Sequence, residues 1–149
     1  MTRITGSKEV SKTLMNLGVD IDRVIRESVY GVAQNVRSHA VQSIATVSVG
    51  ATVTRYTAAG NPYDHIASKG GDAPNTDTGT LIRSIAIEPQ KPAMSIGVGT
   101  NTEYAKFLEF GTERMVERPF LLPAMEAQKR TMKQEVEKAI NRQIAEQAK

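Results

Sequence analysis

Apolar residues recur at steps of three and four along the first third of the chain. The positions fall between residues 10 and 44 and form one stripe, which predicts a long amphipathic helix that begins near Ser7. Gly18 and Gly31 interrupt the stripe, and each weakens a helix by up to about 1 kcal/mol. The pattern therefore leaves open one continuous helix or two helices that meet near Gly18. We expect the stripe to pack on a sheet, with packing on a neighbouring subunit as the alternative.

The hydrophobic period changes after residue 46. Small apolar residues alternate there with Ser, Gly and Thr, at Val47, Val49, Ala51 and Val53. This alternation predicts a strand over residues 47–56 with one buried face. Residues 57–76 are rich in Gly, Pro, Asn and Asp, which indicates a long loop or a second hairpin arm around residues 63–67. Loops of this length are usually functional or disordered, and we expect this one to become ordered against a neighbouring subunit.

A short helix and a hairpin are predicted in the middle of the chain. Asp77 is placed to cap a helix over residues 78–83. Apolar residues alternate again over residues 85–88, which predicts a strand that Pro89 ends. The same alternation returns over residues 94–98 and predicts an antiparallel partner strand.

The C-terminal third reads as a short helix, a turn and a long helix. Apolar residues at helical spacing over 104–110 predict the short helix, with Asn101 or Thr102 as its cap and Gly111 as a left-handed stop. A second stripe predicts the final helix over residues 123–149. Six large residues are expected to anchor both elements on the sheet: Phe107, Leu108, Phe110, Phe120, Leu121 and Leu122. The order of elements predicts a single α+β domain over residues 1–149, in which a small, mostly antiparallel sheet packs against the two long helices.

Composition narrows the class of protein. Aromatic residues make up 5% of the chain and Trp is absent, so the expected core is aliphatic. The chain has no Cys, which excludes disulfides, thiolate metal sites and a Cys nucleophile, and fits assembly in a reducing cytosol. No apolar run reaches the length of a membrane span. The formal charge of +3 is spread among acidic residues, which is typical of a solvated mixed surface.

Patterns that would indicate catalysis or metal binding are weak. Asp77-Thr78-Gly79 matches the loop of aspartic proteases, but no apolar strand precedes it, and a helix cap is the favoured interpretation. His39 and His65 have no partners at metal-ligand spacing apart from Asp64, so surface roles are favoured. Glu109 lies on an apolar helix, and we expect a structural ion pair with Arg118 or Arg83. The sequence thus predicts no catalytic residue, no metal and no cofactor.

Three short motifs follow one another along the chain. The first, D-T-G-x-L-x-x-S-I, is present at Asp77, Thr78, Gly79, Leu81, Ser84 and Ile85. The second, Y-A-x-x-x-E-F-G-T, is present at Tyr104, Ala105, Glu109, Phe110, Gly111 and Thr112. The third, R-P-F-x-x-P-A, is present at Arg118, Pro119, Phe120, Pro123 and Ala124. In these motifs and their order the chain resembles the phage tail-component family, which includes tail-completion and head–tail joining proteins of the neck and proteins like minor tail protein Z. The resemblance covers most of the chain, and residues 46–71 are its least diagnostic part.

The resemblance implies a non-enzymatic structural protein of a siphovirus-like particle, assembled in the host cytoplasm and located in the neck or tail. It implies a ring, sixfold by family analogy, that binds the head-closure or connector ring, the tail terminator or the tail tube. DNA would pass through the lumen, and no membrane would be involved. In a narrower hypothesis, Glu109, Arg118 and Phe120 fix the turn between the last two helices.

A different class of function is kept as the alternative. A small basic DNA-binding or regulatory domain would use the long N-terminal helix as its reader. Arg23, Arg26 and Arg37 are spread along that helix among acidic residues, which does not favour a face that tracks phosphates. A hydrolase ranks below both, because no set of residues in the sequence supports it.

Overall fold

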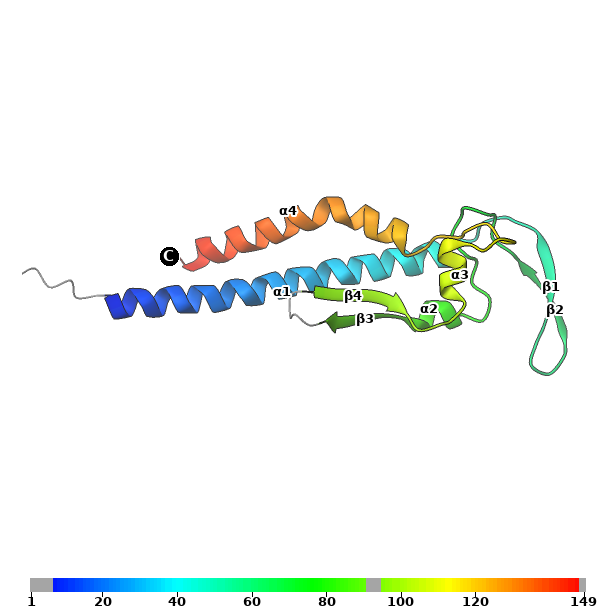
Figure 1. The fold of residues 1–149 in the computed structure, drawn as a ribbon, viewed down its shortest axis with the longest axis horizontal. Helices are drawn as coiled ribbons and strands as arrows, with labels where there is room; N and C mark the ends of the chain where they lie inside the picture. Colours follow the sequence, from blue (N-terminus) through cyan, green and yellow to red (C-terminus); the bar gives the residue numbers. More distant parts are fainter. Residues whose placement is uncertain (1–6, 91–94, 148–149) are drawn as a thin grey trace, which may run out of the picture.

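The computed structural model of the chain describes residues 7–90 and 95–147 and confirms the α+β class. Two long helices run side by side, and two separate β-hairpins and two short helices complete the structure (Figure 1). The elements in chain order are α1 (Ser7–Ala45), β1 (Thr52–Tyr56), β2 (Pro62–Ile66), α2 (Thr80–Ser84), β3 (Ile85–Gln90), β4 (Ser95–Thr100), α3 (Ala105–Phe110) and α4 (Leu122–Gln147).

Helix α1 is the axis of the molecule. It continues without a break through Gly18 and Gly31, which decides between the two alternatives that the sequence left open. Its 39 residues span about 58 Å at the usual rise per residue. Helix α4 returns along one side of it, and the β3–β4 hairpin lies along another (Figure 1).

The hydrophobic core lies toward the C-terminal end of α1. Val36, Ala40 and Ile44 of α1 are buried there against residues from four other parts of the chain: Leu81, Ile85, Ala105, Phe120 and Ala124. Full burial of a side chain such as Ile or Phe contributes roughly 1.5–3 kcal/mol. This packing fixes α2, β3, α3 and the start of α4 around one end of α1.

The β3–β4 hairpin is antiparallel, as predicted, with Ile87 opposite Val98. The strand does not end at Pro89, because the pairing continues through Pro89 to Gln90. A proline has no N–H, so continuous pairing requires that its nitrogen face the outer edge, where no ladder bond is lost. The prediction that Pro89 ends the strand is therefore wrong. Met94 lies outside the described residues.

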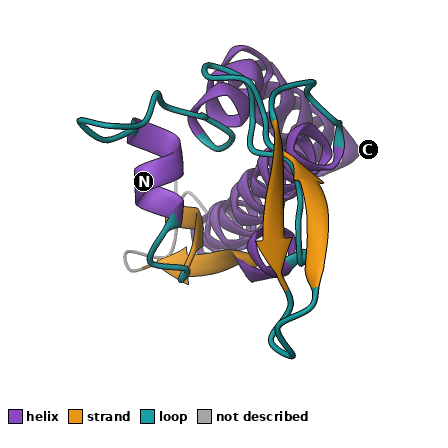
Figure 2. Cartoon of the chain, turned by 90° about the vertical axis from the view of Figure 1, so that its right-hand side faces the viewer, coloured by secondary structure: helices purple, strands orange, loops and turns teal. Residues whose placement is uncertain are grey.

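The predicted hairpin arm is present as β1 and β2. The expected strand over residues 47–56 with a buried face is wrong, because the strand is limited to Thr52–Tyr56 and all five residues are exposed. Val47 and Val49 are exposed as well. Figure 2 shows why: the hairpin projects from the end of the molecule, and no second layer covers it.

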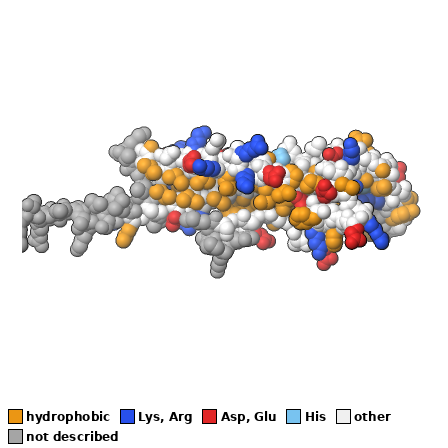
Figure 3. Space-filling model, turned by 45° about the horizontal axis from the view of Figure 1, so that its top comes forward, with side chains coloured by type: hydrophobic (Ala, Val, Ile, Leu, Met, Phe, Trp, Pro, Cys, Tyr) orange, Lys and Arg blue, Asp and Glu red, His pale blue; other side chains and the backbone are white. Residues whose placement is uncertain are grey.

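The six predicted anchor residues divide into two groups. Phe120 is buried, and Leu108 and Leu121 pack against the core. Phe107, Phe110 and Leu122 are exposed instead, so for them the prediction is wrong. Along the molecule, apolar side chains gather in a band on the face shown in Figure 3.

Candidate functional site

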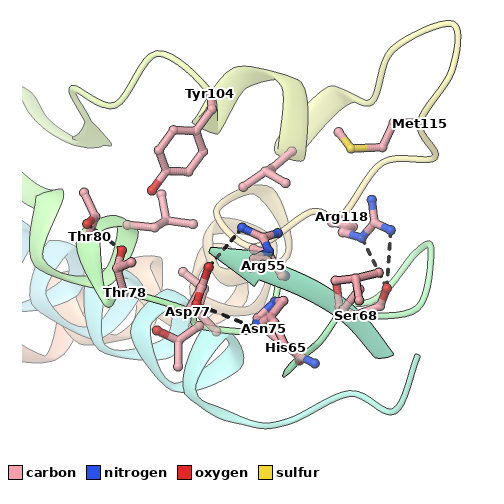
Figure 4. A pocket seen from close by; sticks show the side chains of 17 residues that line it. Arg55, His65, Ser68, Asn75, Asp77, Thr78, Thr80, Tyr104, Met115 and Arg118 are labelled. Carbon is pink, nitrogen blue, oxygen red and sulfur yellow. Dashed lines mark hydrogen bonds and ion pairs between the residues drawn. The ribbon is translucent and has the colours of Figure 1, made fainter. Parts of the chain in front are cut away.

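The sequence motifs meet at the hairpin end of the molecule, around a cavity of about 540 Å³. Asp77 and Thr78 come from the loop before α2, Tyr104 from the start of α3, and Arg118 from the turn before α4 (Figure 4). The arm contributes residues to the opposite wall, including Arg55 and His65. Three motifs that are distant in sequence therefore surround one site.

Asp77 attaches the arm to the body. Arg55 on β1 donates a hydrogen bond to its Oδ2 at 2.9 Å, and the hydroxyl of Tyr63 on β2 donates to its Oδ1 at 2.9 Å. The Nδ1 atom of His65, also on β2, lies 3.8 Å from Oδ1. One carboxylate thus holds both strands of the arm.

The capping role that the sequence predicted for Asp77 is wrong. Gly79 occupies the N-cap position of α2 with a φ of 73°, and no side chain caps this helix. The left-handed backbone at Gly79 favours glycine. The chain turns at Gly79, and the Asp77 carboxylate faces the arm. It accepts hydrogen bonds there from Arg55 and Tyr63 and none from the N–H groups at the start of α2.

Asp77 changes the pKa of the Tyr63 phenol. The hydrogen bond to Asp77 raises the pKa of Tyr63 above its ordinary value, and burial and the negative charge of Asp77 act in the same direction. The positive charge of Arg55 opposes this shift. Tyr63 therefore remains a neutral donor at any pH near neutrality.

A second polar network fixes the base of the arm. Asn75 accepts the backbone N–H of Ser48 at 2.8 Å, and its side-chain amide donates to the carbonyl groups of Ser48 and Ile66 at 2.6 and 2.9 Å. Arg118 donates to the carbonyl of the buried Ser68 at 3.3 Å. Side chains thus supply hydrogen-bond partners for backbone groups of the loop that no neighbouring strand pairs.

Glu109 organises the turn that leads into α4. Its Oε2 accepts the backbone N–H groups of Phe120 and Leu121 at 3.0 Å each, and its Oε1 accepts that of Leu122 at 2.7 Å. A carboxylate at this place satisfies orphan donors of the helix and complements its dipole. The predicted ion pair with Arg118 or Arg83 is wrong, because the carboxylate caps a helix that begins thirteen residues later along the chain, at Leu122.

Gly111 makes the turn after α3 possible. Its φ of 70° is positive, as expected, but its ψ of −173° is extended and lies outside the left-handed helical region. A Cβ atom there would lie 2.8 Å from the carbonyl oxygen of Met115 and 2.9 Å from the nitrogen of Glu117. The turn then returns to α3, where the N–H of Arg118 donates to the carbonyl of Leu108 at 2.6 Å. Glu109, Arg118 and Phe120 therefore do meet at this turn.

The predicted caps of α3 are wrong. Tyr104 takes the N-cap position, and no side chain caps the helix. The hydroxyl of Thr102 lies 3.0 Å from that of Thr100 instead, and Ser84 joins the same group of hydroxyls. The ends of α2 and β4 are linked in this way.

The other motif residues are mainly structural. Leu81, Ile85, Ala105 and Ala124 are buried in the core, and the side chains of Thr78 and Thr80 lie 2.8 Å apart. Phe110 and Thr112 are exposed, and Pro119 and Pro123 flank the segment that Glu109 caps. The motifs thus define how α2, α3 and α4 join at the end of α1.

Within residues 7–90 and 95–147 no three His, Asp or Glu side chains lie close enough to hold a metal ion. His39 is exposed on α1, whereas His65 faces Asp77 rather than solvent. Across the helices that the structure describes, none has the length and hydropathy of a membrane span.

Sequence reasoning missed the partners of the motif residues. Ser48, Arg55 and Tyr63 lie in the stretch with the weakest resemblance to the family, and Asn75 lies between that stretch and the first motif. In the register of the arm Arg55 lies opposite Tyr63. A sequence prediction that included this register would have placed both side chains on one face of the arm, because residues opposite each other on antiparallel strands share a face.

A comparison with models of protein families identifies the family of this chain. The model of the family described as "Bacteriophage HK97-gp10, putative tail-component" matches residues 8–111, which is more than half of the chain. The match includes the first motif and reaches Gly111 of the second, while the third lies beyond it. Neither the curated proteins nor the solved structures compared with the chain gave a match. The chain therefore belongs to the HK97-gp10-like family of bacteriophage tail components and is a structural protein of the phage tail.

Proposed function

We propose that copies of this protein form a ring at the neck of a siphovirus-like particle, where the ring completes the tail and joins it to the head. Family membership supports a tail component, and the ring and the joining role are our extension of it. The ring would bind adjoining head-closure or connector, tail terminator or tail tube proteins by surface contacts, and DNA would pass through its lumen.

The observation that carries the proposal is the exposure of three apolar side chains near the hairpin end of the molecule. Val49 is 83% exposed, Phe110 is 77% exposed, and Val116 is 60% exposed. Isolated exposed apolar residues are normal, but large apolar patches mark interaction sites. These three residues flank the site where the family motifs meet, so we assign that end to subunit or ring contacts.

The mixed charges of the helices agree with this assignment. On α1, Arg23 pairs with Asp20, and on α4, Arg142 pairs with Glu146 at 3.0 Å. Cations that are paired with neighbouring acids track phosphates poorly. We therefore favour protein partners for these helices over a DNA-reading role.

The test is to inactivate the gene in a phage or prophage that carries it and to examine lysates by electron microscopy. We expect filled heads and separate tails, with joined virions restored when the gene is supplied in trans. Complementation with Phe110→Asp should leave the heads and tails separate, while Lys138→Asp, a charge change at an exposed α4 residue, should restore joining. Intact infectious virions without the gene would contradict the joining role.

A further inference from the structure

Each β-hairpin of this protein has one edge that is blocked by proline and one edge that is open. In β3–β4, the unbroken pairing places the Pro89 nitrogen on the outer edge of β3. That edge therefore lacks a donor near its C-terminal end, at the fifth of six residues, and a proline on an edge strand is a common way to prevent strand addition.

The outer edge of β4 has no such block. Because pairs alternate along an antiparallel ladder, Ile96 and Val98 direct their N–H and C=O groups away from β3, as Pro89 does on the other side. Among the described residues, these groups of Ile96 and Val98 have no hydrogen-bond partner outside the strand pair. Open edges of this kind add a further strand readily.

This open edge borders an apolar groove of about 610 Å³. Val32 and Val36 of α1 form its floor, and Met125 and Met132 of α4 lie on the wall opposite β4. Both methionines are about half exposed in the single chain. The groove thus combines unpaired backbone groups on one side with apolar side chains on the other, which is what an added strand requires.

The arm shows the same asymmetry. Bonds from Thr57 to Asn61 and from Ala67 to Ala51 set the alternation, so Pro62 and Ile66 face the outer edge of β2. Pro62 has no N–H, and Asn75 already donates to the carbonyl of Ile66. The outer edge of β2 therefore lacks a donor at Pro62, and its acceptor at Ile66 is already hydrogen-bonded to Asn75.

The outer edge of β1 is open instead. Thr52, Thr54 and Tyr56 direct their backbone groups outward, and β1 contains no proline. All five residues of β1 are exposed. Within residues 7–90 and 95–147 there are thus two open edges, one on the projecting arm and one beside the groove.

We propose that β1 of one copy adds to β4 of the next copy and that the arm thereby fills the neighbour's groove. This proposal rests on the proposed ring and identifies its subunit contact. The two strands match in length, five residues against six. When the outward groups of Thr54 pair with those of Ile96 or Val98, the side chains of that face enter the groove, including Tyr56 and Ile66.

The charges of the two surfaces are complementary. Asp64 is the charged residue on the face of the arm that would enter the groove, and it lies opposite Thr54. Lys129 on the groove rim has no ion-pair partner among the described residues. Glu126 also lies on the rim, where the hydroxyl of Tyr56 can donate to it. The strand pair itself opposes no like charges, since β4 is uncharged and β1 carries Arg55 alone.

The proposed contact is heterologous, because β1 and β4 are different surfaces. Figure 1 shows the arm at one end of the molecule and β4 beside the C-terminal half of α1. Heterologous contacts repeat from copy to copy and close into a ring when the rotation allows it. The two proline-blocked edges would prevent the hairpins from pairing in other ways.

The first experiment removes one outward N–H from β1. Thr54→Pro removes no backbone hydrogen bond within the hairpin, whereas the matched variant Thr54→Ala keeps the N–H. Both variants lose the hydrogen bond from the Thr54 hydroxyl to Asp64 Oδ1 at 3.3 Å, so that loss does not separate them. We expect both variants to fold equally by circular dichroism. Thr54→Pro should form roughly tenfold less ring, or even less, by native mass spectrometry of the purified chain and by microscopy of particles from a complemented phage.

The outcomes separate the two proposals. Equal ring formation by Thr54→Pro and Thr54→Ala would overturn the strand addition and leave the neck ring standing. A wild-type chain that forms no ring, alone or in particles, would remove the ring itself and the strand addition with it.

A cross-link tests whether positions 64 and 129 of neighbouring copies lie close together. The chain has no Cys, so Asp64→Cys and Lys129→Cys each carry a single thiol, and a mixture of the two chains can be joined by a short bismaleimide. We expect a cross-linked pair of chains from this mixture. Lys138→Cys, which is exposed farther along α4, should link to Asp64→Cys much less. If Asp64→Cys linked equally to Lys129→Cys and to Lys138→Cys within assembled rings, the proposed position of the arm in the groove would be contradicted.

Discussion

The turn before α4 and the base of the arm are each organised by one motif carboxylate, but the two carboxylates act in opposite ways. Glu109 binds three backbone N–H groups beside the buried Phe120. Asp77 binds charged and polar side chains of an exposed hairpin. The sequence favoured the reverse assignment, with Asp77 as the cap and Glu109 in an ion pair.

This difference teaches that the partner decides what a carboxylate contributes. Backbone donors at a helix start are fixed by the helix, so the Glu109 contacts cost little ordering and stabilise the fold. The side chain of Arg55 is half exposed, and its contact with Asp77 is screened by water. We therefore expect the first region to control global stability and the second to control the position of the arm.

The largest effect should follow from Phe120→Ala, which removes the apolar support of the turn before α4. Phe120 is 2% exposed, and a Phe-to-Ala change in a core costs about 3–5 kcal/mol. Urea unfolding measures the loss. Phe110→Ala is the control, and its change should stay within about 0.5 kcal/mol because that side chain is exposed. Similar losses for both variants would remove the distinction between core and surface at this turn.

A smaller loss is expected for Glu109→Ala. It leaves three backbone N–H groups at the start of α4 without their acceptor, which should cost about 2 kcal/mol. Glu113→Ala, a nearby exposed carboxylate, should be close to neutral. A Glu109 variant as stable as the Glu113 variant in thermal unfolding would show that the cap contributes nothing.

Asp77→Asn should change local rather than global stability. Loss of the pair with Arg55 is expected to cost less than about 1 kcal/mol in urea unfolding. Amide hydrogen exchange should become faster in β1 and β2 and remain unchanged in β3 and β4. Unchanged exchange throughout the arm would mean that Asp77 does not hold it.

The smallest effect is a pH dependence at Tyr63. Since its pKa is raised in the folded chain, the contact with Asp77 is fully present below about pH 10 and is lost as the pH rises through the raised pKa. Asp77→Asn should move the pKa of Tyr63 back toward its ordinary value. An NMR titration of the ring, assigned with Tyr63→Phe, measures the shift, and an identical titration in both chains would argue against the hydrogen bond.

The sequence predicts well the elements that depend on local periodicity, and predicts poorly the contacts between residues that are distant along the chain. The stripe of α1, the β3–β4 pair, the arm and the positive φ of Gly111 follow from period and turn chemistry, which depend on near neighbours. The partners of Asp77 and Glu109 depend on which distant segments the core brings together. Val47 and Val49 alternate with polar residues and are nevertheless exposed, because alternation indicates a buried face only where a second layer exists.

The pairing of α1 with α4 has a consequence for synthesis of the chain. About 75 residues separate the two helices, so at about 5–20 residues per second α1 waits roughly 4–15 s for its partner after leaving the ribosome. During that interval its apolar stripe has no cover from α4. Nascent chains of this protein are therefore expected to bind chaperones that recognise exposed aliphatic segments, and release should coincide with the emergence of α4.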